Sequence, residues 1–298
     1  VKVSKSTDGY IIDNGMVKTY IPLGGHNVID SIVLNGCKIA TNGRLVASTQ
    51  STPVSEATES VTFTNYTSLI TGVDVERLGN HRALVRLDGV HADGNGREWL
   101  PFTLRLYFYG NSPEIRMTHT FIFDGDQDKD FIRSLGVRFN VPMREAPYNR
   151  HIAFSTSQGG VWSEPVQPLA GRRTLRLDPD RRKAETPSMQ QRQMDGERIP
   201  EVEAFDEANR NLIADWATWD SYRLSQLTPD GYTIRKRAKT SAPWIGTFAG
   251  DRSEGYAFAG DISGGLGIRI KDFRESCPSG IAIDGAASDM AVMTAWLW

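Results

Sequence analysis

The stretch FTLRLYFYGNSPEIRMTHTFIF, residues 102–123, shows the pattern that decides the fold. Each half alternates apolar side chains with polar or amphipathic ones. The apolar faces carry Leu104, Leu106 and Phe108 in the first half and Ile115, Met117, His119, Phe121 and Phe123 in the second. A period of two places alternate side chains on one face of a β-strand, so we expect two half-buried strands. We interpret His119 as a hydrogen-bonded core histidine.

The alternation continues outward from this stretch. Residues 134–142, SLGVRFNVP, place four apolar side chains on one face and Arg138 on the other. Turn signals separate such runs along the chain: Asn35-Gly36, Asp93-Gly94, Asp124-Gly125, Asp230-Gly231, Gly264-Gly265 and Asp284-Gly285. Many strands with Gly, Asn and Asp turns and few helical periods predict an all-β fold, a large antiparallel β-sandwich in one domain over residues 1–298.

One segment departs from the strand pattern. Residues 171–215 are highly charged and poor in aromatic residues. We expect a long insertion, irregular or partly helical near 201–212, that forms a lid or a contact surface for a neighbouring domain. The alternative is partial disorder, because so polar a segment buries little apolar surface.

The composition excludes several classes of protein. Among 298 residues, 23% are charged and 39% hydrophobic, and the net charge is −2, so no global charge favours nucleic acid or a membrane surface. No apolar run approaches the ~20 residues of a membrane span, and no signal peptide is visible. Two cysteines without a CxxC motif argue against zinc and a disulfide framework. The compartment stays open, with a secreted or periplasmic location favoured over a cytoplasmic one.

The densest charge pattern follows the opening stretch. Asp124, Asp126 and Asp128 match the first, third and fifth ligand positions of an EF-hand loop, but Lys129 and Leu135 occupy the positions that require Gly and Glu. An Asp-Gly pair between two apolar runs predicts a hairpin with a solvated tip. We therefore favour the turn, with no metal, and keep calcium as the weaker alternative.

Several long strings resemble one known family. They are FTLRLYFYGNSPEIRMTHTFIFDGDQDKDFIRSLGVRFNVPM (102–143), YNRHIAF (148–154), YRLSQLTPDGYTIRKRAKTSAPWI (222–245) and GYAFAGDISGGLGIRIKDF (255–273). They are similar to the central β-sandwich, of super-sandwich type, in the exo-rhamnogalacturonan lyase (YetA-like) family. One departure is DFRESCPSG, where Arg274 and Cys277 stand at positions for which the family pattern implies aromatic residues.

The resemblance implies a longer protein and a reaction. Family members have an N-terminal β-barrel and a C-terminal α/α toroid, which would be the partners of this chain and are absent from it; the start at Val1 and the ending VMTAWLW fit a piece of a longer polypeptide. The implied substrate is rhamnogalacturonan, an anionic polysaccharide of pectin, cleaved by β-elimination. The alternatives are a glycoside hydrolase component and a non-catalytic carbohydrate-binding or structural sandwich.

Elimination needs a base and a cation that neutralises the uronate carboxylate. The loop PYNRH supplies His151 as a base, Arg150 as a carboxylate clamp and Tyr148, with Asn149 as a binding residue. The alternative for this loop is a solvated turn.

Further residues could bind the substrate. Alternation in TIRKRAK places Arg235 and Arg237 on one strand face, where guanidinium groups can fork onto carboxylates, or where aspartates balance them. The other candidates are Arg138, Lys271, Trp162 and Trp244. Tryptophan can stack on a sugar ring, although most tryptophans lie in cores or interfaces.

Overall fold

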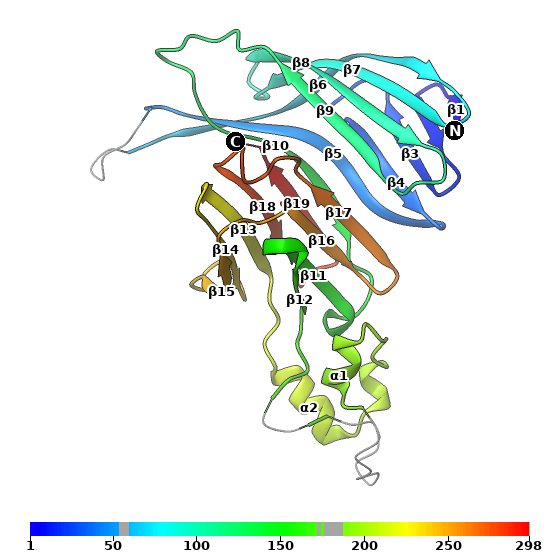
Figure 1. Cartoon of the computed structure of the whole chain (residues 1–298), viewed down its shortest axis with the longest axis vertical. Coiled ribbons are helices and arrows are strands. Elements are labelled where there is room, and N and C mark those ends of the chain that lie inside the picture. Colours follow the sequence, from blue (N-terminus) through cyan, green and yellow to red (C-terminus); the bar gives the residue numbers. More distant parts are fainter. Residues whose placement is uncertain (54–59, 172–173, 176–186, 298) are drawn as a thin grey trace. The chain divides into compact units, whose positions relative to one another are not determined.

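The computed structural model describes residues 1–53, 60–171, 174–175 and 187–297. The chain forms two compact units, the first from residues 1–140 and 294–298 and the second from residues 141–293 (Figure 1). Strands dominate both units, and every strand pair whose register is defined is antiparallel, which confirms the predicted fold class. No helix among the described residues is long and apolar enough to cross a membrane.

The strands of the first unit form two arms of one continuous sheet, which share β5. Its strands are β1 (Lys2–Lys5), β2 (Gly9–Asp13), β3 (Val17–Pro22), β4 (Ile29–Leu34), β5 (Cys37–Gln50), β6 (Phe63–Leu78), β7 (Arg82–Ala92), β8 (Glu98–Tyr109), β9 (Ile115–Phe121) and most of β10 (Phe131–Pro142). The pairing runs β1-β2-β3-β4-β5 and β5-β6-β7-β8-β9, with β10 on the other edge of β5.

Strand β5 belongs to both arms of this sheet. Its first half pairs with β4, up to the partners Gly43 and Ile29, and its second half pairs with β6 from Val46 onward. Between the two halves, Asn42 has a φ of 51°, and a Cβ on Gly43 would lie 2.3 Å from the ring of Phe139. Any side chain larger than that of glycine would clash with this ring. The packing of Phe139 in β10 therefore requires a glycine at the bend in β5.

The predicted alternation is present in the strands. Leu104, Leu106 and Phe108 of β8 are fully buried, and the apolar side of β9 is more covered than its polar side. In β10 the apolar face is buried as well. These faces meet in the core of the first unit because a period of two sends every second side chain inward.

The aspartate segment forms a polar loop but not a hairpin. β9 pairs with β8, whereas β10 pairs with β5, so the predicted hairpin between them is wrong. A turn signal is local, while the partner of each strand is set by distant apolar faces. Asp124 accepts a hydrogen bond from the backbone N–H of Leu100 at 2.8 Å, and Asp126 binds Lys129. Within the described ranges no three His, Cys, Asp or Glu side chains are placed to hold a metal ion.

Two histidines pack against each other in this unit. The rings of His91 and His119 lie 6.0 Å apart, and both contact the ring of Phe102. His91 shares a hydrogen bond with the carbonyl of Leu100, but the Nε2 atoms of both histidines are buried and have no partner among the described residues. Burial, followed by repulsion from His91, lowers the pKa of His119 to about 4.

The second unit is also a sandwich. One sheet runs β12-β11-β16-β17, and the other runs β18-β13-β14-β15 with the start of β19 beside β18. The bounds are β11 Arg150–Ser155, β12 Val161–Pro165, β13 Ser221–Thr228, β14 Gly231–Arg237, β15 Ile245–Gly250, β16 Tyr256–Asp261, β17 Gly264–Arg269, β18 Ser279–Asp284 and β19 Met290–Trp296. Between the sheets, Trp162 contacts Phe154 and Tyr222, and Lys236 pairs with Glu164 at 2.5 Å.

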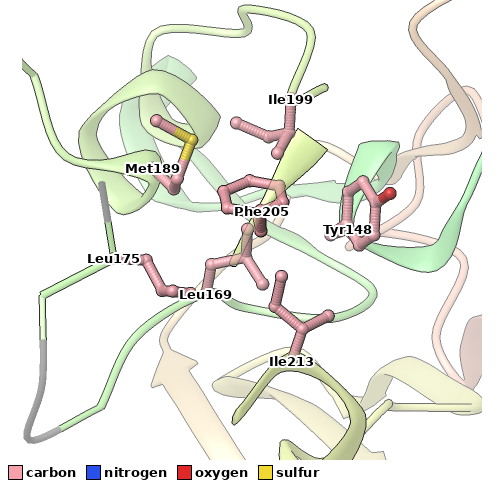
Figure 2. Packing of buried hydrophobic residues seen from close by; sticks show 7 residues of the cluster. All are labelled: Tyr148, Leu169, Leu175, Met189, Ile199, Phe205 and Ile213. Carbon is pink, nitrogen blue, oxygen red and sulfur yellow. The ribbon is translucent and has the colours of Figure 1, made fainter. Parts of the chain in front are cut away.

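The predicted insertion has helices and a small core of its own. It contains α1 (Met189–Met194), a 3-10 turn (Val202–Ala204) and α2 (Glu207–Asp215), and Ser188 and Asp206 cap the two helices. Figure 2 shows the cluster of buried side chains that holds it together: Tyr148, Leu169, Leu175, Met189, Ile199, Phe205 and Ile213. The partly helical character is confirmed; the disorder alternative concerns residues 172–173 and 176–186, which lie outside the described residues.

We predict that Asp124 stabilises the first unit without a metal. Leu100 is fully buried with a φ of 47°, a costly backbone conformation, and its N–H depends on the Asp124 carboxylate. Asp124→Ala should lower the free energy of unfolding by about 1–2 kcal/mol. Asp128→Ala, which changes an exposed side chain in the same loop, is the control. Urea unfolding of both variants, with calcium and with a chelator, measures their free energies of unfolding. Equal stability of the two variants, or a loss of stability in Asp124→Ala that depends on calcium, would contradict the prediction.

We also predict that the first unit loses stability on mild acidification. In the unfolded chain His119 binds a proton near its ordinary pKa of 6.5, whereas in the folded chain its pKa is about 4. Stability is therefore complete above pH 6.5 and falls as the pH drops toward 4, by up to about 3 kcal/mol. His119→Phe should flatten this dependence in urea titrations between those pH values. His81→Phe, at an exposed histidine, should not. An unchanged slope in His119→Phe would show that other groups cause the loss.

Candidate functional site

The loop predicted to be catalytic, PYNRH (147–151), packs into the second unit mainly through buried and hydrogen-bonded side chains. Tyr148 lies in the core of the insertion, and Asn149 exchanges two hydrogen bonds with the backbone of Ile199. The Arg150 side chain is almost fully buried and donates to the carbonyls of Glu145, Ala286 and Ser288. Burial lowers the pKa of Arg150, although Asp289 nearby opposes this. This geometry supports a structural role for the three residues.

His151 is the one member of that loop at an open hollow. The hollow has a volume of about 470 Å³, and Ser163, Phe258 and Asp261 help to line it. Burial alone lowers the pKa of His151, so the imidazole is neutral at neutral pH and can accept a proton. Among the described residues, no arginine or lysine lines this hollow. We call it the Phe258 hollow.

Other predicted residues lie apart from this hollow. In the first unit, Arg138 donates to Thr294 Oγ1 at 3.1 Å. Trp162 is enclosed between the two sheets of the second unit by Phe154 and Tyr222. Lys271 is highly exposed on the turn after β17 and pairs with its neighbour Asp272.

Three further predicted residues, two on β14 and Trp244 directly before β15, come together. Lys236 points into the sandwich, and therefore Arg235 and Arg237 point out of it, as the alternation predicted. The Arg237 guanidinium lies 4.5 Å from the centre of the Trp244 ring. Thr233, Arg235, Trp244 and Thr247 line a second hollow of about 570 Å³, which we call the Arg235 hollow.

One arginine of this face was missed by the sequence reasoning. Arg223 is the cross-strand partner of Arg235, and its guanidinium lies 5.0 Å from the centre of the Trp244 ring. Arg223 also forms two hydrogen bonds with the carboxylate of Asp284, each 2.8 Å long. The alternation in YRLSQ, followed by Asp230-Gly231, was the signal that would have placed Arg223 opposite Arg235.

Arg235 itself is the free cation of this surface. It is exposed, and it has no hydrogen-bond or ion-pair partner among the residues that the structure describes. Its other cross-strand neighbour is Gly246, whose missing side chain leaves open space beside the guanidinium. Five N–H groups in a fixed fork are thus available to a carboxylate next to an aromatic ring. The arrangement can bind an anion that carries an apolar face.

The comparisons with known proteins agree with the resemblance in the sequence. Residues 1–298 match the family described as PcRGLX-like protein central beta sandwich domain. A Bacillus subtilis (strain 168) protein named "Uncharacterized protein YetA" is 32% identical over 291 residues, which are 96% of this chain and 32% of that protein. The chain therefore spans about a third of the length of this relative. The chain belongs to the PcRGLX-like, YetA-related family, as its central β-sandwich domain.

Proposed function

We propose that the Arg235 hollow binds uronate residues of an acidic polysaccharide, and that the chain serves a polysaccharide lyase that cleaves rhamnogalacturonan by β-elimination. The observation that carries the proposal is the unpartnered guanidinium of Arg235 beside the Trp244 ring. A uronate has a carboxylate for the first group and axial C–H bonds for the second. Membership in the rhamnogalacturonan-lyase-like family supports the choice of substrate.

The reaction needs more than this hollow supplies. In β-elimination a base removes the proton next to the uronate carboxylate, and the 4-linked sugar leaves. The carboxylate must be neutralised while charge develops, and Arg235 has the right chemistry for this step. His151, the base predicted from the sequence, lies on the other sheet, at a hollow with no arginine or lysine among its described lining residues, so it is not placed to act on a uronate held by Arg235. We therefore expect groups outside residues 1–298, in the proposed barrel and toroid domains, to complete the active site.

Hydrolysis is the less favoured alternative. It requires two carboxyl groups facing a common cleft. Of the residues that the structure describes, two acids line the Phe258 hollow, and both are engaged: Glu164 pairs with Lys236, and Asp261 accepts hydrogen bonds from Arg144 N and Ser263 N. Binding without turnover would leave the chain as a carbohydrate-binding domain.

We predict that Arg235 and Trp244 carry the binding of acidic oligosaccharides. Arg235→Ala or Trp244→Ala should weaken binding of a rhamnogalacturonan oligosaccharide by roughly tenfold or more, because each variant removes one charged or stacking contact. Arg116→Ala, at an exposed arginine on β9, is the matched control. Calorimetric titration at two salt concentrations measures the affinities, and salt should weaken only the binding that involves Arg235. Equal affinities for all three variants would remove the Arg235 hollow from the proposal.

We further predict that the chain alone turns over little substrate. Residues 1–298 and a longer form, extended on both sides to the length of the relative, are mixed with the same oligosaccharide. The ultraviolet absorbance of the unsaturated uronate should rise with the longer form. A rise with residues 1–298 alone would place the base within this chain and make His151→Ala the next variant. Release of reducing ends without a rise in absorbance would indicate hydrolysis and contradict elimination.

A further inference from the structure

The outer face of the β12-β11-β16-β17 sheet carries aromatic rings over a bed of small residues. Ala257 and Ala259 are fully buried between the sheets. Tyr256 and Phe258, which alternate with them, therefore point outward. Their cross-strand partners in β17 are Arg269 and Gly267, and the next pair on the same face of the ladder, two positions further along, is formed by Gly260 and Gly265. Two glycines thus face each other directly beside the ring of Phe258.

These glycines let the rings lie along the sheet. A Cβ on Gly260 or on Gly265 would approach Cζ of Phe258 to 2.7 Å. In the same way, a Cβ on Gly267 would approach Cε2 of Tyr256 to 2.9 Å. Each ring therefore leans over a position that only glycine can occupy. Glycine weakens a strand interior, and a close approach of another group is a recurrent reason to keep it there.

The Phe258 ring forms one wall of the hollow that contains His151. The backbone pairs His151 with Gly260, so the imidazole stands directly beside the glycine that the ring covers. Ser163 and Pro165 of β12 line the hollow on the other side of His151, and Met194, the last residue of α1, also lines it. The volume of about 470 Å³ lies within the range of small-molecule sites.

The polar groups of this hollow suit an uncharged ligand. Two acids among the described lining residues, Glu164 and Asp261, are already paired or hydrogen-bonded, and His151 is the one basic side chain of that described lining. His151 has no hydrogen-bond partner among the described residues, and the same holds for the Ser163 hydroxyl. A neutral imidazole and a hydroxyl can each donate and accept one hydrogen bond. The open groups thus match hydroxyl groups rather than a carboxylate.

We propose that the Phe258 hollow binds an uncharged pyranose residue, with the sugar's C–H face on the Phe258 ring and its hydroxyls on His151 and Ser163. The site is separate from the Arg235 hollow, which lies on the other sheet of the same unit. The inference rests on the proposed function for the general ligand class, carbohydrate, but it does not depend on Arg235. Together the two hollows would receive the neutral and the acidic residues of one substrate class.

Ligand-observed saturation-transfer NMR tests the proposal with the chain as it stands. The probes are methyl α-L-rhamnopyranoside and methyl β-D-galactopyranoside, which carry no charge. The unaltered protein should transfer saturation to at least one of them. Phe258→Ala should reduce the transfer by roughly fivefold or more, and His151→Ala should reduce it as well. Phe63→Ala removes an exposed phenylalanine of the first unit and should leave it unchanged. Thermal melting checks that each variant folds, and His151→Ala carries the test if Phe258→Ala does not fold.

Two further arms separate the hypotheses. Arg235→Ala should weaken the binding of a rhamnogalacturonan oligosaccharide but not the binding of the neutral glycosides. If this variant also lost the binding of the neutral glycosides, the proposal of a second, separate site would be overturned. Competition between the oligosaccharide and the methyl glycoside would support recognition of a sugar within a chain, and its absence would limit the site to free sugars. No transfer from the unaltered protein, or transfer from both Phe258→Ala and His151→Ala that is as strong as from the unaltered protein, would overturn the proposal. Self-association that Phe258→Ala abolishes, without sugar binding, would identify a protein-docking surface in its place.

Discussion

The ion pair between Glu164 and Lys236 is the interaction on which the second unit depends. It connects β12 to β14 through the interior of the sandwich, and the Lys236 ammonium also lies 4.1 Å from the centre of the Trp219 ring. Burial raises the pKa of Glu164, and Lys236 opposes that shift, so the pair is costly to bury and costly to break. Its geometric effect is clear: with Lys236 inward, its two arginine neighbours must face outward.

From that constraint follow two surfaces with different chemistry on the two sheets of one sandwich. One combines a free guanidinium with a tryptophan, in a hollow bordered by Gly246. The other combines a phenylalanine ring with a neutral imidazole, over Gly260 and Gly265. In both places a missing side chain makes room beside an aromatic ring. Small residues thus shape the two proposed binding surfaces as much as the larger groups that are proposed to contact a ligand.

Local patterns predicted the parts of this molecule that depend on local geometry. The alternation around Leu104 and around Arg235 placed strand faces correctly, and the charged insertion was identified with its helical part. Such patterns could not predict contacts between residues that are distant in the sequence. The Asp124 turn signal, for example, could not show that β9 and β10 pair with different strands. For the same reason Arg150 looked like a free clamp, because the carbonyls of Ala286 and Ser288 lie more than 130 residues away.

The order in which the chain enters its two units has a consequence for synthesis. The first unit needs residues 1–140 and also residues 294–298, while everything between belongs to the second unit. A nascent chain that has reached residue 140 therefore still lacks the final strand segment, which arrives only after the whole second unit has emerged. N-terminal-first folding, the usual order on the ribosome, would leave an open edge for that interval. The second unit is thus an insertion that the first must accommodate before it can close.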